Sequence, residues 1–85
     1  MPIIFADKAW DDYQHWQAHD AKMMERVNTL IKEVRRDPFA GIGKPERLRG
    51  DLAGYLARRI SEEHRMVYKI ENNKVLFAQL RFHYY

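Results

Sequence analysis

Hydrophobic residues recur at helical spacing in the first half of the chain. Within residues 20–37 they follow the three- and four-residue intervals of an amphipathic helix: Met23, Val27, Leu30, Ile31 and Val34. Asp20 is placed to cap the start of this helix, and Arg35 with Arg36 suits the negative end of its dipole. The pattern therefore predicts one long helix with a single buried face.

Two further elements are predicted before this helix. The short apolar run PIIFA at residues 2–6 fits a buried strand. Residues 7–20 then place three aromatic side chains and one amide on a single helical face: Trp10, Tyr13, Trp16 and Gln17. Asp7 is placed as the N-cap of this first helix. Two consecutive helices with a short join predict a helical hairpin.

The second half of the chain begins with a segment that has no period. Residues 37–51 contain five residues that interrupt regular structure: Pro38, Gly41, Gly43, Pro45 and Gly50. We expect an irregular loop there. Hydrophobic residues then alternate with period two, which predicts strands within 54–60, 64–70 and 74–84. The segments SEEH and ENNK stand where hairpin turns should join these strands.

Alternation also assigns the faces of these strands. One face is expected to be apolar: Leu56, Ile60, Met66, Tyr68, Ile70, Leu76, Ala78, Leu80, Phe82 and Tyr84. The helical hairpin is its only available cover. The predicted fold is therefore α+β, with the hairpin packed on one face of a twisted, antiparallel-rich β-sheet that the first strand joins. The opposite face stays open and carries four basic or titratable side chains: Arg59, Arg65, Arg81 and His83. The closing residues RFHYY would end the last strand, anchored by Phe82 and Tyr84 while His83 faces outward.

Composition limits the class of protein. A chain of 85 residues with 46% hydrophobic residues is expected to form one folded domain over residues 1–85. It has no cysteine, which excludes disulfides and cysteine-based metal sites or nucleophiles. Hydrophobic runs reach only about five residues, too short to span a membrane, and no secretory leader opens the chain. We expect a cytoplasmic protein.

Charge is distributed unevenly along the chain. Residues 1–34 carry a net charge of −2 and residues 35–85 a net charge of +5. Eight of the eleven basic residues in the second segment are arginine, the side chain suited to bidentate contact with phosphate. This asymmetry suggests a polyanionic partner, either nucleic acid or an acidic protein, and a solvated surface with an accidental bias is an equal alternative on charge alone.

A basic open face that carries a histidine suggests cleavage of RNA without a metal ion. The 2′-hydroxyl of RNA is its own nucleophile, so the protein must supply a base, an acid for the departing 5′-oxygen and positive charge at the phosphate. His83 is a candidate acid or base, because histidine titrates near neutral pH. Arg65 is a candidate phosphate ligand, and Glu46, in a basic stretch of the loop, is a candidate for the second proton carrier.

Each assignment has a simpler alternative. His83 could be merely exposed, and Arg65 could pair with Glu62 or Glu63. The run EEH lacks the paired histidines of a zinc-protease helix, so we interpret His64 as a turn or core-edge residue.

Other patterns in the chain are also explained by packing. His15 and His19 are four residues apart on the first helix but have no third metal ligand, so we predict no metal and no cofactor. Four large side chains are interpreted as core residues: Trp10, Trp16, Met23 and Met24.

Several segments in combination resemble one family. WDDYQHWQ, the stretch LIKEVRRDPFAGIGKPERLRGDLAGYLARRISEEHRMVYKI and the closing RFHYY resemble the YoeB family of bacterial toxins, within the RelE superfamily, over residues 5–84. The run GKPE followed by RRISEEHRMVY and a terminal HY is specific in combination. The resemblance implies a ribosome-dependent mRNA endoribonuclease of a type II toxin–antitoxin pair, with a small microbial-RNase-like fold. Such an enzyme would cut mRNA in the ribosomal A site, leaving a 2′,3′-cyclic phosphate and a 5′-hydroxyl.

The resemblance also implies roles for seven residues. Glu46 would be the general base, His83 the general acid and Arg65 the stabiliser of the pentavalent phosphate, while Tyr84 would help to position the substrate. Three further basic residues would bind RNA phosphates: Lys44, Arg49 and Arg59. The chain departs from the expected pattern at two positions. Phe82 stands where we expect Tyr, and Tyr85 extends one residue beyond the usual His-Tyr end.

A partner is implied as well. It is a YefM-like antitoxin whose C-terminal segment is disordered alone and folds on the toxin. An acidic, amphipathic segment would meet some of five arginines: Arg49, Arg58, Arg59, Arg65 and Arg81. It would inhibit either by covering them or by displacing RFHYY, which we expect to be held only by Phe82 and Tyr84. A homodimer is a further candidate assembly, and no membrane partner is expected. Two alternatives to the nuclease remain: a non-catalytic RNA- or ribosome-binding module, and a pure protein-interaction domain.

Overall fold

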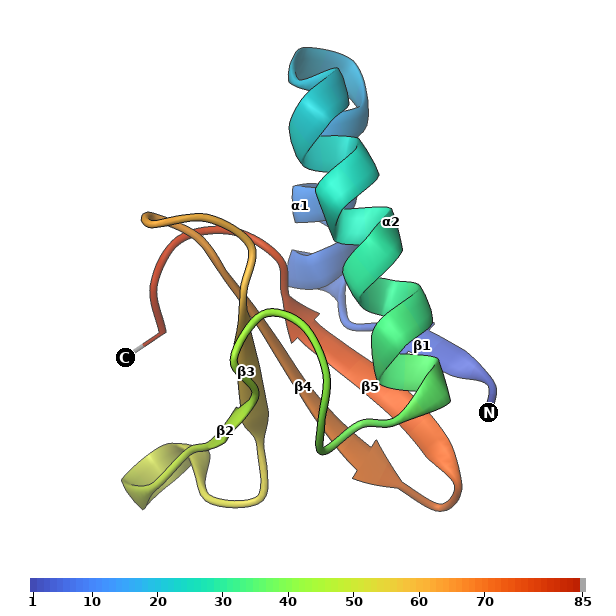
Figure 1. The fold of residues 1–85 in the computed structure, drawn as a ribbon, viewed down its shortest axis with the longest axis vertical. Coiled ribbons are helices and arrows are strands. Elements are labelled where there is room, and N and C mark those ends of the chain that lie inside the picture. The colour runs from blue at the N-terminus through green and yellow to red at the C-terminus, as the bar shows by residue number, and fades with distance from the viewer. Residues whose placement is uncertain (85) are drawn as a thin grey trace.

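The computed structural model describes residues 1–84, and in it two helices cover one face of a five-stranded sheet (Figure 1). In chain order the elements are β1 (Ile3–Phe5), α1 (Asp7–His19), α2 (Ala21–Arg36), β2 (Glu46–Arg47), the 3₁₀ turn η1 (Gly50–Leu52), β3 (Leu56–Arg59), β4 (Arg65–Glu71) and β5 (Lys74–Gln79). The strand order is β1-β5-β4-β3-β2, with β1 parallel to β5 and every other pair antiparallel. The predicted α+β fold is confirmed, including the entry of the first strand into the sheet.

Helix α2 follows its sequence pattern closely. The Oδ1 atom of Asp20 accepts a hydrogen bond from the backbone N–H of Met23 at 3.1 Å, so the predicted cap is confirmed. Of the five residues of the predicted apolar face, Met23 is partly buried and the other four are buried: Val27, Leu30, Ile31 and Val34. Within residues 1–84, no helix is long and apolar enough to cross a membrane.

Helix α1 differs from its prediction at two positions. It begins at Asp7, so the N-cap is Ala6 and the prediction of Asp7 as the cap was wrong. Trp16 is buried in the core as predicted, but Trp10 is 46% exposed. The Trp10 ring stacks on Tyr13 at the rim of the helix layer, with ring centroids 5.9 Å apart, which gives it an aromatic neighbour without enclosing it.

Both predicted hairpin turns are present. Asn72 and Asn73 have positive φ angles of 51° and 60°, the conformation of a type I′ turn, and asparagine tolerates this region better than most residues. In the turn between β3 and β4, the Ser61 hydroxyl accepts hydrogen bonds from the backbone N–H groups of Glu63 and His64.

The two faces of β5 are the reverse of those predicted. Val75 and Phe77 are fully buried under the helices, whereas Ala78 packs on the opposite face with a second, small apolar cluster. The expectation that Leu76 and Ala78 face the helices was therefore wrong. Both alternating sets of β5 are apolar, so period two could not choose between them. A β-bulge adds to the difference, because Tyr68 pairs with Phe77 but Val67 pairs with Gln79, leaving Ala78 as the extra residue.

Residues 80–84 do not continue the last strand. β5 ends at Gln79, and Phe82 has a φ of 66°, which no strand residue adopts. Phe82 is 46% exposed and is not the expected core anchor. The guanidinium of Arg81 lies 5.8 Å from the Trp16 ring of α1, so Arg81 is not on the open face. Tyr85, the extra terminal residue, lies outside the described residues.

Candidate functional site

A depression of about 160 Å³ opens beside β2 and β3. Its walls combine a carboxylate, a phenol and four basic side chains with one alanine: Lys44, Glu46, Ala57, Arg58, Arg59, Arg65 and Tyr84. Five of the seven residues predicted from the sequence therefore meet here. The two that do not line it are His83 and Arg49.

Glu46 reaches the depression because it lies on β2, a two-residue strand inside the segment that we expected to be irregular throughout. β2 pairs with β3 so that Glu46 stands opposite Ala57, and directly opposed residues of an antiparallel pair share a face. The carboxylate therefore projects from the face opposite the helices. A two-residue strand carries no periodic signal, which is why the sequence did not reveal it.

Tyr84 joins the C-terminal tail to Glu46. Its hydroxyl donates a hydrogen bond of 2.5 Å to Oε1 of Glu46, and its ring packs against the small cluster that contains Ala57 and Val67. The hydrogen bond to the carboxylate raises the pKa of the Tyr84 hydroxyl above its usual value, and desolvation raises it further. Tyr84 therefore remains a hydrogen-bond donor at neutral pH.

Arg58 holds the loop that precedes β2, and the sequence reasoning missed this role. Its side chain is fully buried, and its Nε donates to the hydroxyl of Tyr68 at 3.1 Å. Its two terminal nitrogens donate to three loop carbonyl oxygens at 2.5–3.0 Å: Asp37, Ala40 and Ile42. The available signal was the position of Arg58 between Leu56 and Ile60 in the period-two pattern. The expectation that Arg58 could meet an antitoxin was wrong, because its charge is enclosed by the loop.

Gly43 brings the same loop onto the core just before Lys44. Its carbonyl oxygen accepts a hydrogen bond of 2.6 Å from the backbone N–H of Arg59. A Cβ atom at Gly43 would lie 3.0 Å from a methyl group of Leu30, and its φ of 85° is in the region that favours glycine. This close approach starts the chain along β3, so that Glu46 comes to lie opposite Ala57.

Arg65 opens β4 and is fixed by backbone rather than by a carboxylate. Its Nη1 donates to three carbonyl oxygens of the preceding turn, at 2.7–3.1 Å: Ser61, Glu62 and His64. Among residues 1–84, the ion pairs of Glu62 and Glu63 are with Arg59 and His64, so the alternative pairing of Arg65 is not seen. Nε and Nη2 of Arg65 donate to no other residue within 1–84, and Arg65 lines the depression.

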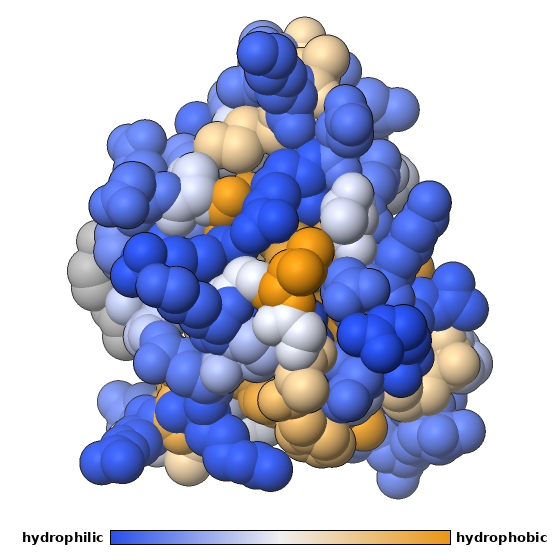
Figure 2. Space-filling model, in the orientation of Figure 1, coloured by the Kyte–Doolittle hydropathy of each residue, from blue (hydrophilic) through white to orange (hydrophobic). Residues whose placement is uncertain are grey.

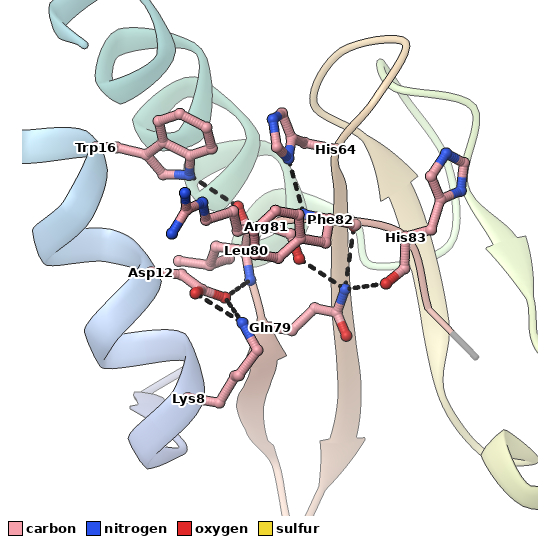
Figure 3. Close-up of polar contacts among 9 residues, drawn as sticks. All are labelled: Lys8, Asp12, Trp16, His64, Gln79, Leu80, Arg81, Phe82 and His83. Carbon is pink, nitrogen blue, oxygen red and sulfur yellow. Dashed lines mark hydrogen bonds and ion pairs between the residues drawn. The ribbon is translucent and has the colours of Figure 1, made fainter. Parts of the chain in front are cut away.

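His83 and Arg49 lie outside the depression. The imidazole of His83 is exposed and projects away from the contacts that hold its own backbone (Figure 3). The backbone N–H of Arg65 donates to the carbonyl oxygen of Phe82 at 3.0 Å. The residue just before His83 is therefore bonded directly to a residue of the depression. Arg49 is exposed and precedes η1.

The remaining histidines do not form a metal site. The rings of His15 and His19 are 4.7 Å apart, but no group of three or more His, Asp or Glu side chains within residues 1–84 is arranged to hold a metal ion. His64 is buried at the core edge, as predicted, with its ring against the edge of Trp16. Burial lowers the pKa of His64, which favours the neutral imidazole.

The surface around the loop is mostly hydrophilic. Figure 2 shows one face of the molecule, where a narrow hydrophobic strip crosses polar surface in the region occupied by the loop after α2. The large exposed hydrophobic residues of this loop are Phe39 and Ile42. Arg47 lies over the Phe39 ring at 5.1 Å, which joins the strip to basic surface.

Comparison with known proteins gives one consistent family. Residues 5–84 match the model of the YoeB-like toxin of bacterial type II toxin-antitoxin system. The toxin YoeB of Streptomyces coelicolor is 49% identical over 84 residues, covering 99% of this chain and 100% of the relative. The structure of a YoeB/ParE toxin from Agrobacterium tumefaciens superposes with a TM-score of 0.96 at 49% identity, covering 99% of this chain and 100% of that one. Structures of YoeB from Staphylococcus aureus, as a dimer and as a heterotetrameric YoeB-YefM toxin-antitoxin complex, superpose with a TM-score of 0.90 at 41% identity, covering 99% of this chain and 98% of theirs.

Proposed function

The chain belongs to the YoeB-like toxins of bacterial type II toxin–antitoxin systems, and from that premise we propose that it is a ribosome-dependent endoribonuclease that cleaves mRNA in the ribosomal A site. The observation that carries the proposal is the depression in which the Glu46 carboxylate meets the basic side chains of Arg65, Arg59 and Lys44. A carboxylate can accept a proton there while the cations hold a phosphate.

The proposed reaction needs three chemical roles, and this chain has a residue for each. Glu46 takes the proton of the 2′-hydroxyl, whose oxygen attacks the adjacent phosphorus. Arg65 stabilises the added negative charge of the pentavalent phosphate. His83 gives a proton to the 5′-oxygen as the P–O bond breaks. The products are a 2′,3′-cyclic phosphate and a 5′-hydroxyl, and the scheme assigns no role to a metal ion.

Four further residues support binding rather than proton transfer. Tyr84 orients Glu46 through the 2.5 Å hydrogen bond and positions the substrate. Lys44 and Arg59 hold phosphates at the rim of the depression, and Arg49 extends this basic surface outward. An mRNA substrate on the ribosome places the protein in the cytoplasm.

The test is cleavage of translated mRNA by purified protein and 70S ribosomes, followed by primer extension and analysis of the product ends. Glu46→Ala and His83→Ala should each reduce the rate by about 10²- to 10⁴-fold, the usual contribution of one acid–base group. Lys22→Ala, on the exposed surface of α2, controls for the loss of a charged side chain.

The same assay separates the nuclease from a non-catalytic binding module. A binding module would keep its full effect in His83→Ala but lose it in Arg59→Ala and Arg65→Ala, with a steep dependence on salt. Equal rates for the wild type and for His83→Ala would reject the catalytic proposal.

We further propose a YefM-like antitoxin and a homodimer as the assemblies of this chain, in line with the Staphylococcus aureus structures. The antitoxin's acidic segment would meet exposed arginines, which here include Arg49 and Arg59. Hydrogen exchange distinguishes covering from displacement of the tail, because the amides of Leu80 and Phe82 are hydrogen-bonded to side chains in the free protein. Displacement would speed exchange at both amides, and covering would slow it or leave it unchanged. A footprint that avoids both the tail and the arginines would refute this account of the partner.

A further inference from the structure

The C-terminal tail, residues 80–84, is hydrogen-bonded to the first and the last side chain of a row that crosses the sheet. Pairing across four strands aligns Glu46 with Ala57, Ala57 with Val67 and Val67 with Gln79, so these four residues share the face opposite the helices. Adjacent strands are about 4.8 Å apart, which puts Gln79 roughly 14 Å from Glu46 across the sheet. Glu46 binds Tyr84 at one end of the row, and Gln79 binds the start of the tail at the other.

Gln79 binds three consecutive carbonyl groups. Its Nε2 donates to the carbonyl oxygens of Arg81 at 2.9 Å, Phe82 at 3.1 Å and His83 at 2.8 Å (Figure 3). Three acceptors around one end of the amide require the NH₂ group there, and its two hydrogens are shared among them. The carbonyl groups of residues 81–83 therefore all point at one side chain. A carboxylate at position 79 would repel all three.

His64 holds the same turn from the other side. Its Nδ1 accepts a hydrogen bond of 2.7 Å from the backbone N–H of Phe82, which requires a neutral ring with its proton on Nε2. Nε2 lies 3.4 Å from a carboxylate oxygen of Glu63, and burial favours the neutral form. These contacts offset the cost of the left-handed conformation of Phe82, whose φ is 66°.

Helix α1 fixes the residue at which the turn begins. The backbone N–H of Leu80 donates to Oδ2 of Asp12 at 3.0 Å, and its carbonyl oxygen accepts from Nε1 of Trp16 at 2.8 Å (Figure 3). Asp12 is itself buried and paired with Lys8 at 2.7 Å. Leu80 therefore starts the tail from a rigid point, and the direction of the next three residues depends on Gln79 and His64.

We propose that Gln79 and His64 are positioning residues for His83, which hold the turn over residues 81–83 so that the imidazole meets the scissile phosphate at Arg65. Neither side chain touches the substrate in this account. The proposal rests on the proposed function, because it takes His83 to be the general acid. Its experiment is therefore chosen so that the two can fail separately.

The experiment compares two ribosome-bound mRNA substrates in single-turnover cleavage. One has the natural 5′-oxygen at the cut site, and the other has a bridging 5′-sulfur. When the P–S bond breaks, sulfur leaves as a thiolate with the bonding electrons and needs no proton, so the general acid becomes dispensable. A defect in the general acid therefore appears with oxygen and disappears with sulfur.

Gln79→Glu is the main variant because it keeps the shape of the side chain and removes its donors. We expect its rate on the oxygen substrate to fall by about 10²-fold, the usual cost of a misplaced catalytic group, and no further than that of His83→Ala. On the sulfur substrate it should match the wild type. Gln14→Glu, at an exposed position on α1, is the matched control for the added charge and should not change either rate.

Variants of His64 supply a conservative rescue. His64→Asn keeps an acceptor near the position of Nδ1 and should stay close to the wild-type rate. His64→Phe keeps the ring but removes the acceptor, and it should show the same oxygen-specific defect as Gln79→Glu. A purely structural role would instead lower the rates on both substrates together.

The two substrates separate failure of the general-acid assignment from failure of the positioning proposal. If His83→Ala remains defective on the sulfur substrate, His83 is not the general acid and the proposed function is wrong on that point. If the sulfur substrate rescues His83→Ala but not Gln79→Glu, or if Gln79→Glu cleaves the oxygen substrate at the wild-type rate, the positioning proposal is overturned. Gln79→Met removes the donors without adding charge, and equal losses on both substrates in this variant would overturn it too.

Discussion

Replacing Arg58 with methionine would test whether one buried cation organises the loop that carries the candidate site. The methionine side chain fills much of the same space but cannot donate a hydrogen bond. The change would remove one bond to the Tyr68 hydroxyl and three to loop carbonyl oxygens. The loop between α2 and β2 would then be held to the core by fewer bonds, chiefly those from Tyr68 to Pro38 and from the backbone of Arg59 to Gly43.

The expected loss of stability follows from these contacts. A protein hydrogen bond contributes about 0.5–1.5 kcal/mol net, so four contribute roughly 2–6 kcal/mol. A hydrophobic replacement of a buried charge recovers part of this, since the desolvation cost of the charge also disappears. Tyr68 also keeps a partner, because its hydroxyl donates to the carbonyl oxygen of Pro38. We therefore expect a net loss of about 3 kcal/mol.

Urea unfolding followed by circular dichroism would measure this loss. In a domain of this size, 3 kcal/mol corresponds to a fall in Tm of roughly 12–24 °C. Arg59→Met is the matched control, since Arg59 is the next residue and its side chain is exposed. It should change the free energy of unfolding by less than about 0.5 kcal/mol. A loss below about 1 kcal/mol in Arg58→Met, or an equal loss in the control, would refute the reasoning.

Three other predictions concern the pH dependence of stability, the Asn72–Asn73 turn and the Tyr84 hydroxyl at the candidate site. Burial lowers the folded-state pKa of His64, so the unfolded chain binds its proton more readily and the free energy of unfolding should fall as pH drops below about 6.5. His64→Asn should make that fall shallower in thermal melts across pH, and an unchanged slope would contradict it. Asn73→Val should cost about 1–2 kcal/mol because a β-branched residue resists a φ of 60°, whereas Asn73→Gly should not, and equal stabilities in urea would argue against the turn assignment. Tyr84→Phe should slow mRNA cleavage about 10-fold by removing the hydrogen bond to Glu46, and it should lower Tm by only a few degrees because that bond is exposed; an unaltered rate would exclude a role for the hydroxyl.

Elements whose stabilising contacts are local could be predicted from the chain. The cap at Asp20, the buried face of α2 and the Asn72–Asn73 turn each depend on residues within a few positions of one another. Period two likewise located the three main strands. For the candidate site, a resemblance over nearly the whole chain named seven residues, and the structure brings five of them to one depression.

Other features depended on contacts between distant residues. The bonds that hold Leu80 come from Trp16 and Asp12, which are 64 and 68 residues away in the chain. No pattern within 74–84 could show that the strand ends at Gln79, and the apolar residues of that stretch favoured a longer strand. The choice between the two apolar faces of β5 was also made by its partners, because Ile70 and Tyr68 stand opposite Val75 and Phe77.

Arg58 shows the physical reason most clearly. Its charge favours the surface in any local reading, because burying an unpaired cation is costly. Burial becomes favourable only when the loop carbonyl groups and Tyr68 surround the guanidinium, and that arrangement exists only after α2, the loop and the sheet have packed together. Local spacing in the sequence predicts which residues share a face. The groups that stabilise the buried Arg58 charge and the C-terminal tail come from distant parts of the chain, and only the tertiary structure brings them together.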